Sequence, residues 1–200
     1  MILKIKYTQE IYLEGIKELM NKMKNIIRIL RKCVSRISPV FSNKIMYRVR
    51  MHKKLNIKNP KTFNDKINWL KLNNYQNNEL VIKCTDKYLV REYIREKGYD
   101  YLLNDLYFSC NSVDEIKWEN LPQKFVLKCN HGTGYNILCN DKNVFDYKAA
   151  KVKLNRWINE DFGLVSVEPH YSKIKRKIIC EKFLEDEIKD YKFFVLMGNH

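Results

Sequence analysis

The 200-residue sequence lacks several features that would place it in a familiar class of proteins. It has no uninterrupted run of about eighteen apolar residues, so no helix is expected to span a membrane. Its first residues, MILKIKYTQEIYLEG, mix acidic and short apolar groups without an apolar centre and do not resemble a secretion signal. There is no internal repeat and no low-complexity linker. Because 45% of the residues are hydrophobic, the chain can still bury a core, and a globular protein is expected.

The six cysteines lack the spacing of a metal-binding or redox motif. None forms a C-x-x-C pair, and Cys129, His131 and Cys139 match no common zinc pattern. Cys129, Cys139 and Cys180 lie in apolar runs, where a reduced cysteine behaves as a small hydrophobic residue. We therefore expect no metal site among these residues and a protein of the reducing cytoplasm.

Acidic residues are missing from one long stretch of the chain. Residues 19–64 contain no Asp or Glu but thirteen Lys and Arg. The net charge of +15 is accordingly uneven, because residues 1–100 hold 23 Lys and Arg against 9 Asp and Glu, and residues 101–200 hold 15 against 14. Such a segment is expected to bind an anionic partner, which lipid headgroups, a nucleic acid or an acidic polymer would each satisfy.

A helix with one apolar side is predicted over residues 22–37, KMKNIIRILRKCVSRI, and Pro39 is expected to end it. The apolar positions with helical spacing are Ile26, Ile27, Leu30, Val34 and Ile37. Two interpretations stay open. The helix lies on an anionic membrane surface, which would make the protein peripheral at the inner face of the membrane, or it is a surface helix docked on the body of the protein.

Three further helices are predicted from their end signals. Thr62 with Asp65 three residues later fits a capping box at the start of the first. The second is expected to begin near Thr85–Asp86 and to end at Gly98. The third is expected to run from Asp146 to Gly163.

Five strands are predicted, at 106–110, 124–129, 136–140, 177–184 and 191–197. The second and third are close enough in sequence to pair as an antiparallel hairpin, which favours an α+β fold. We divide the chain into an unassigned extension (1–21), a basic amphipathic helical region (22–60) and an α+β domain (61–200).

The hairpin encloses a glycine turn in FVLKCNHGTGYNILCN, residues 125–140. The turn is not a P-loop, because the G-x-x-x-x-G-K-[ST] spacing is absent, and it is not a dinucleotide-binding fingerprint, because a strand follows where a helix is required. Backbone N–H groups in such a turn can point at phosphate oxygens, and Lys128 before the turn would add a positive charge. An ordinary flexible hairpin with Lys128 on a solvated face is the alternative.

An ordered set of blocks extends this observation to most of the chain. They are NPKTFNDKINWLKL, DKYLVREYI, LPQKFVLKCNHGTGYNILCNDK, KLNRW, KIICEKFLED and DYKFFVLMG. Together, over about residues 44–200, they resemble the TupA-like branch of the ATP-grasp superfamily, which is associated with teichuronopeptide and other surface-polysaccharide loci. The resemblance implies an ATP-grasp-like α+β fold that clamps ATP between two lobes, here incomplete and preceded by a basic helical region.

The resemblance also implies a role for individual residues. Lys87 and Lys128 would contact the nucleotide phosphates, and the loop that folds over those phosphates would be His131, Gly132, Thr133 and Gly134. The hinge strand that reads the adenine edge would be Glu181, Lys182, Phe183 and Leu184, with Glu181 contacting the amino group. Asp190 would bind the ribose hydroxyls, and Lys192 would be catalytic, near the transferring phosphate.

The implied activity is an ATP-dependent ligation through an acyl phosphate, with a polysaccharide or peptide precursor as acceptor. In the family about another third of the domain follows the point at which this sequence ends, and it carries the magnesium ligands. We therefore expect little or no ligase activity from a chain that itself holds no magnesium ligands. It is either a truncated product or fragment of a longer chain, or a complete protein that has lost catalysis. Tyr135 also replaces a frequent glycine of the family and is expected to stiffen or reshape the loop.

Two functions from other classes remain open. A glycosyltransferase of the same loci is one, although no D-x-D metal motif is present. A basic nucleic-acid-binding module is the other, but no motif that reads a nucleic acid is visible, and none is expected as a partner.

Overall fold

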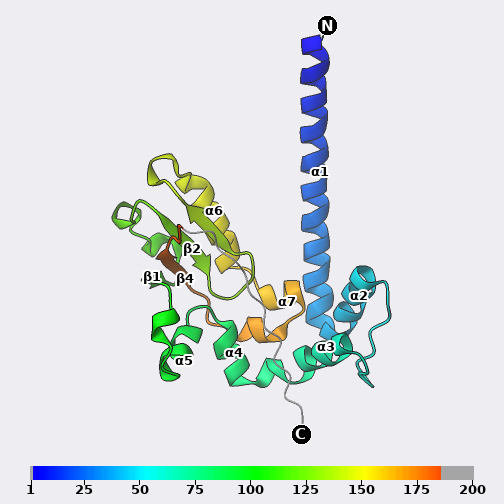
Figure 1. Cartoon of the computed structure of the whole chain (residues 1–200). Helices are drawn as coiled ribbons and strands as arrows, with labels where there is room; N and C mark the ends of the chain where they lie inside the picture. Colours follow the sequence, from blue (N-terminus) through cyan, green and yellow to red (C-terminus); the bar gives the residue numbers. More distant parts are fainter. Residues whose placement is uncertain (1, 186–200) are drawn as a thin grey trace.

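The structure is a computed structural model and describes residues 2–185 of the chain, shown in Figure 1. The predicted strand at 191–197 and the candidate residues Asp190 and Lys192 lie outside the described residues. The α-helices are α1 Ile2–Ile37, α2 Pro39–Met51, α3 Phe63–Asn73, α4 Glu79–Thr85, α5 Val90–Glu96, α6 Tyr147–Ile158 and α7 Phe162–Ser166. The strands are β1 Leu106–Cys110, β2 Phe125–Cys129, β3 Asn136–Cys139 and β4 Ile178–Lys182.

The four described strands form one antiparallel sheet with the order β1-β4-β2-β3. The hairpin of β2 and β3 has the register Phe125↔Cys139 to Lys128↔Asn136, which confirms the predicted antiparallel pairing. Strand β4 returns from far along the sequence and lies between β1 and β2. The α+β class predicted from the sequence is therefore confirmed.

The two faces of the sheet have different environments because side chains alternate along a strand. Phe125, Leu127 and Cys129 of β2 point to one face, where they are fully buried against Leu154 and Trp157 of α6. The opposite face carries the even-numbered positions of β2, among them Lys128. The main core cluster therefore lies on one side of the sheet, and Lys128 lies on the other side, where Val126 and Ile179 are also buried.

Helix α1 is the longest element and projects beyond the rest of the protein in Figure 1. At 1.5 Å per residue its 36 residues span about 54 Å. It runs without a break across residues 21–22, where a boundary was predicted from the sequence, and it ends at Ile37. Ser38 caps the next helix by accepting a hydrogen bond from the backbone N–H of Phe41, and Pro39 takes its first position. No helix within residues 2–185 is long and apolar enough to cross a membrane.

The predicted capping box at Thr62 and Asp65 is confirmed, with both reciprocal hydrogen bonds present. The predicted end near Gly98 is also confirmed, since this glycine adopts φ +78° just after α5. The predicted start of that helix is wrong, because α4 ends at Thr85 and α5 begins only at Val90. Between them the Asp86 carboxylate accepts hydrogen bonds from two backbone N–H groups and holds a turn.

The third predicted helix, from Asp146 to Gly163, is correct only in its first part. Asp146 caps α6 as expected, but α6 ends at Ile158. Asp161 then accepts a hydrogen bond from Leu164 N–H and starts the short helix α7. A second capping residue therefore divides one apolar run into two helices.

Replacing leucine by alanine should have different effects on stability on the two faces of the hairpin. Leu127→Ala removes a fully buried side chain and should lower the free energy of unfolding by about 2–5 kcal/mol. Leu138→Ala, on β3, is the matched control, because Leu138 is 59% exposed. Urea unfolding measures both. Similar losses for the two variants would contradict the assignment of the faces.

Candidate functional site

Lys128 lies on the face of the sheet that is turned away from the main core. Its Nζ is 2.5 Å from Oε2 of Glu181, on the neighbouring strand β4. Glu181 is buried, and its other oxygen, Oε1, lies 3.4 Å from Nη1 of Arg91 on α5. Arg91 is itself fixed by donating to the carbonyl oxygen of Asn104 at 2.6 Å. One buried carboxylate thus holds two cations, which is the arrangement a charge at this depth requires.

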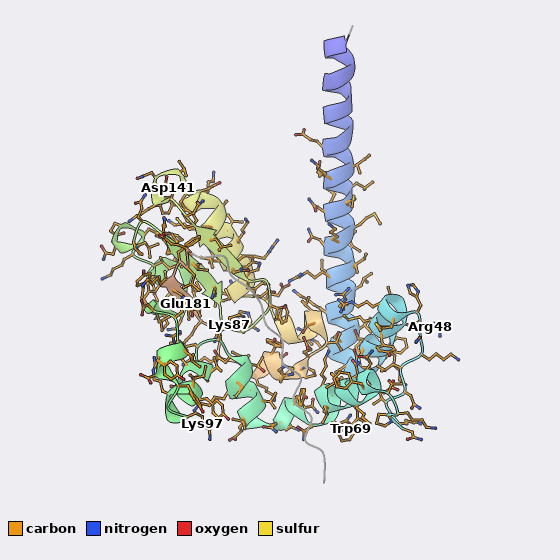
Figure 2. All side chains as sticks on the ribbon, in the orientation of Figure 1. Arg48, Trp69, Lys87, Lys97, Asp141 and Glu181 are labelled. Carbon is orange, nitrogen blue, oxygen red and sulfur yellow. The ribbon has the colours of Figure 1, made fainter. Side chains whose placement is uncertain are left out.

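Lys87 approaches the same place from the turn between α4 and α5. Its ammonium group donates to the carbonyl oxygens of Cys129 and Gly132, at the two ends of the segment that enters the glycine turn. Figure 2 labels Lys87 and Glu181 at the same part of the sheet. Burial lowers the pKa of Lys87, and the positive charge of Lys128 lowers it further. The structure thus places the two lysines close enough for their charges to repel each other.

A buried polar network fixes Lys87 to the base of the turn. Asn130 is fully buried and donates to Asp86 Oδ1 and to Lys175 O, both at 2.9 Å. Its side-chain oxygen accepts from the backbone N–H of Lys177 at 2.7 Å, and its backbone carbonyl accepts from Lys87 N–H at 3.3 Å. Burial raises the pKa of Asp86. These bonds join the α4–α5 turn, the end of β2 and the start of β4 into one support.

The glycine turn itself is anchored at one end and open at the other. His131 is buried, and its Nε2 lies 3.1 Å from the carbonyl oxygens of Trp157 and Glu160. Burial lowers the pKa of His131, so the neutral ring with a proton on Nε2 satisfies both carbonyl groups. A Cβ at Gly132 would lie 2.8 Å from the ring of Tyr135, so only glycine fits there. Thr133 and Gly134 are exposed, and Gly134 adopts φ +72°.

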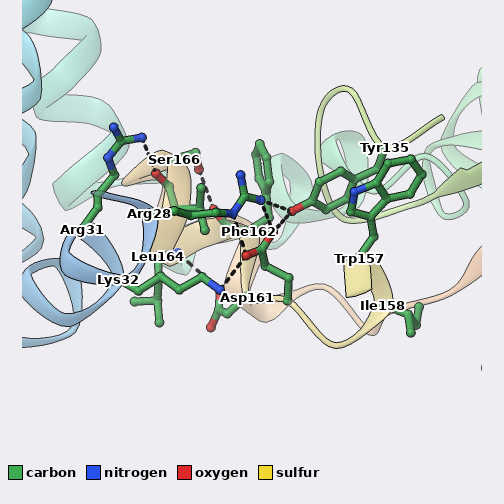
Figure 3. Close-up of polar contacts among 12 residues, drawn as sticks. Arg28, Arg31, Lys32, Tyr135, Trp157, Ile158, Asp161, Phe162, Leu164 and Ser166 are labelled. Atoms are coloured by element: carbon green, nitrogen blue, oxygen red, sulfur yellow. Dashed lines mark hydrogen bonds and ion pairs between the residues drawn. The ribbon is translucent and has the colours of Figure 1, made fainter. Parts of the chain in front are cut away.

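Tyr135, the residue after the turn, is held by a cluster that reaches helix α1 (Figure 3). Its ring stacks on Trp157 with centroids 5.2 Å apart, and its hydroxyl donates to Glu160 Oε2 at 2.5 Å. Arg28 donates through Nε to Glu160 Oε1 at 2.8 Å and through Nη2 to the Tyr135 hydroxyl at 3.0 Å. Lys32 Nζ lies 2.5 Å from Glu160 Oε1. The expectation that Tyr135 stiffens the loop agrees with these contacts.

Glu160 is ionised in this cluster. Burial alone would raise its pKa, but the hydrogen bonds from Arg28, Lys32 and Tyr135 outweigh burial and lower it to about 2. The same contact with Glu160 raises the pKa of Arg28. Burial, followed by the hydrogen bond to Glu160, raises the pKa of Tyr135 well above its usual value. The cluster therefore keeps one negative and two positive charges together near neutral pH.

The predicted hinge begins in β4 and continues beyond it. Lys182 is the last residue of the strand. Its backbone N–H donates to the carbonyl oxygen of Asp105 at 2.9 Å, and its carbonyl oxygen accepts from Asn104 Nδ2 at 2.8 Å. Its side chain pairs with Asp105 at 3.2 Å. Phe183 and Leu184 follow the strand, the first half-buried and the second 49% exposed. Lys182 therefore faces β1, and only Glu181 points to the two lysines.

Several residues of the site carry no clear signal in the sequence. Arg91 and Asn130 lie in helical and strand-like segments, and Glu160 looks like a surface acid at a helix end. One signal for Glu160 does exist, because the acid-free stretch of residues 19–64 must find its carboxylate partners elsewhere. Among the described residues, no three His, Cys, Asp or Glu side chains gather as they would around a metal ion.

The chain forms a helical region followed by an antiparallel sheet that carries a glycine turn and two neighbouring lysines. This is the architecture of an ATP-grasp-like α+β protein. The model of the TupA-like ATP-grasp family matches residues 65–200, and the chain belongs to this family. No curated protein matches the chain. No solved structure matches it either.

Loss of the buried Glu160 carboxylate should destabilise the fold, whereas loss of an exposed carboxylate should not. Glu160→Gln removes the charge that Arg28 and Lys32 share and should lower the free energy of unfolding by about 2 kcal/mol. Glu18→Gln is the matched control, because Glu18 and its partner Lys22 on α1 are both 69% exposed. Urea unfolding of both variants at neutral pH should show the loss only for Glu160→Gln. Equal stability of the two variants would show that the cluster is not stabilising.

The pH dependence of that difference follows from the lowered pKa of Glu160. A carboxylate with a folded-state pKa below its unfolded value stabilises the fold above the unfolded pKa, and the contribution is lost as pH falls through the folded pKa. The difference between wild type and Glu160→Gln should therefore be full above pH 4.5 and disappear toward pH 2. A difference that stays constant over this window would contradict the ion-pair account.

Proposed function

We propose that this protein binds ATP beside the face of the sheet that carries Lys128, with the triphosphate between Lys87, Lys128 and the exposed part of the glycine turn. The observation that carries the proposal is the approach of both ammonium groups to one place on that face. The charges of Lys87 and Lys128 repel each other, and this repulsion adds to burial in lowering the pKa of Lys87. A polyanion placed between them would remove the repulsion, which makes the site complementary to phosphate oxygens.

The glycine turn supports the same assignment. Its anchored part, His131 and Gly132, is packed against Tyr135, so the backbone before the turn is fixed. Its exposed part, Thr133 and Gly134, has open space around Gly134, where an added Cβ would meet nothing within 4 Å. Backbone N–H groups there can approach phosphate oxygens closely without a side chain in the way.

The base of the nucleotide would lie toward the end of β4. The backbone groups of Lys182 already bond to Asn104 and Asp105, so we assign the adenine edge to Phe183 and Leu184, which follow the strand. Glu181 holds Lys128 and Arg91 in this structure, and its role is then to orient the phosphate-binding lysine. Asp190 and Lys192 keep their proposed roles at the ribose and at the transferring phosphate.

The chemistry proposed for the whole family fold is an ATP-dependent ligation. ATP bound at the site would supply the phosphoryl group that activates a carboxylate before an amine attacks it. In this proposal the residues described here bind and orient the nucleotide, and Lys87 and Lys128 balance its negative charge. For this chain we propose a polysaccharide or peptide precursor of the cell envelope as the acceptor, and cytoplasm as the compartment. Magnesium, expected for the family, has no ligand set assigned among residues 2–185.

Nucleotide titration tests the phosphate assignment. Calorimetry of the 200-residue chain with ATP and Mg²⁺ should show binding, and Lys128→Ala and Lys87→Ala should each weaken it about 10- to 100-fold, because each removes a charge-assisted contact. Lys124→Ala, on the same hairpin, is the matched control. Lys124 is exposed and pairs with Glu185 at 2.7 Å, so its loss should leave nucleotide affinity unchanged.

The outcomes of this titration separate the proposal from its alternatives. Equal ATP affinity with and without Lys128, in variants that keep the wild-type circular dichroism, would overturn the site. Binding of a nucleotide sugar with no competition from ATP would favour a glycosyltransferase, and a salt-sensitive oligonucleotide complex with no response to ATP would favour a nucleic-acid module.

A further inference from the structure

Helix α1 presents an apolar stripe that the rest of the protein leaves open over residues 16–37. The exposed fractions of Leu19, Ile26, Leu30 and Ile37 are 60%, 56%, 59% and 87%. These positions lie on one side of a helix that turns about 100° per residue. In Figure 2 the side chains drawn along the middle of α1 stand clear of the rest of the protein. A long helix with an apolar stripe in water is not a stable surface unless something covers it.

The body of the protein binds the opposite side of this helix. Arg28 and Lys32 contact Glu160, and Arg31 donates to the carbonyl oxygen of Val165 at 3.4 Å. At about 100° per residue Arg28 and Lys32 lie on the far side of α1 from Ile26 and Leu30, and Arg31 lies between the two sides. The sequence left two interpretations of this helix, docking on the body of the protein and binding to a membrane surface. Docking on the body uses the polar side of the helix, so the apolar side stays available for a membrane.

Helix α2 widens the open apolar surface. It packs beside α1, and Ser35 donates to Ser42 at 2.8 Å in the contact. The two helices border a shallow groove of about 340 Å³. It is lined by Ile27, Arg31 and Val34 from α1 and by Ser42, Ile45, Met46, Val49 and Arg50 from α2. Ile45 and Val49 are 45% and 68% exposed, so the apolar surface continues from one helix to the other.

From residue 19 onward the charged residues of both helices have one sign, because Glu18 is the last acid on α1. Residues 19–64 carry thirteen Lys and Arg and no acid, and this stretch contains the second half of α1 and all of α2. Lys24 and Arg36 on α1 and Lys44 and Arg48 on α2 border the apolar surface with positive charge. Apolar residues bordered by cations match an anionic lipid surface, where acyl chains accept the apolar side and phosphate groups attract the basic residues.

A second copy of the chain is the main competing occupant. Ile16, Leu19, Met23, Ile26 and Leu30 follow the three-then-four spacing of a coiled coil. Two such helices would, however, bring together basic segments that contain no carboxylate between residues 19 and 64, so ion pairs between them are not available in that segment. A nucleic acid would use the charge but not the apolar stripe.

From the exposed stripe, its continuation onto α2 and the uniform positive charge, we propose that α1 and α2 dock on an anionic membrane surface. The apolar side of both helices enters the interface, and the α+β domain, held on the polar side by Glu160, stays above it. This proposal does not depend on nucleotide binding. It assigns the basic helical region a partner of its own, a bilayer rich in acidic phospholipid.

Vesicle sedimentation of the full chain tests the proposal. The protein should sediment with vesicles of phosphatidylcholine mixed with phosphatidylglycerol, bind much less to phosphatidylcholine alone and be released by added salt. Leu30→Ser should weaken binding roughly tenfold, and Val152→Ser on α6 is the control, because Val152 is also apolar and 65% exposed. Lys24→Gln with Arg36→Gln should weaken it by about fivefold for each charge, whereas Lys148→Gln with Lys153→Gln on α6 should not.

Three outcomes would overturn the proposal. One is binding that Leu30→Ser and Val152→Ser weaken equally, in variants with wild-type circular dichroism. Another is a stable dimer in sedimentation velocity that Leu30→Ser dissociates, with no binding to acidic vesicles. The last is binding of an oligonucleotide that Leu30→Ser does not weaken and that added acidic vesicles do not displace.

Discussion

The ion cluster around Glu181 is the interaction on which the face of the sheet that carries Lys128 depends. A carboxylate buried on β4 is stable only because Lys128 and Arg91 reach it from β2 and α5. Lys128 is therefore held near the sheet instead of extending into water. The same carboxylate leaves a net positive charge on this face, because Lys87 adds a third cation. An anionic ligand bound there would neutralise this remaining positive charge.

The glycine turn links this face to the basic helical region. Tyr135 closes the turn, and its hydroxyl shares Glu160 with Arg28 and Lys32 of α1. The turn, α6 and α1 therefore meet at one ion cluster around the buried Glu160, although they come from distant parts of the sequence. The two proposed surfaces, one for a nucleotide and one for lipid, are in this way built on a common support.

Much of the fold and part of the site could be predicted from the sequence because their signals are local. The hairpin around Gly132, the capping box at Thr62 and the end of α1 before Pro39 each follow from neighbouring residues. Lys87 and Lys128 were paired only through resemblance to the family. The sites that were missed depend on long-range contacts, such as Glu160 with Arg28, which are 132 residues apart. The division between α6 and α7 was missed because Asp161 lies inside a run that is otherwise typical of one helix.

The central claim is that Lys87 and Lys128 flank a nucleotide triphosphate, and lysine footprinting tests it most directly. An amine-acetylating reagent, followed by mass spectrometry of peptides, measures the reactivity of each lysine with and without ATP. The account predicts that ATP protects Lys87 and Lys128 and leaves Lys124 unchanged. Protection of other lysines in their place, or ATP binding with no change at either residue, would contradict it.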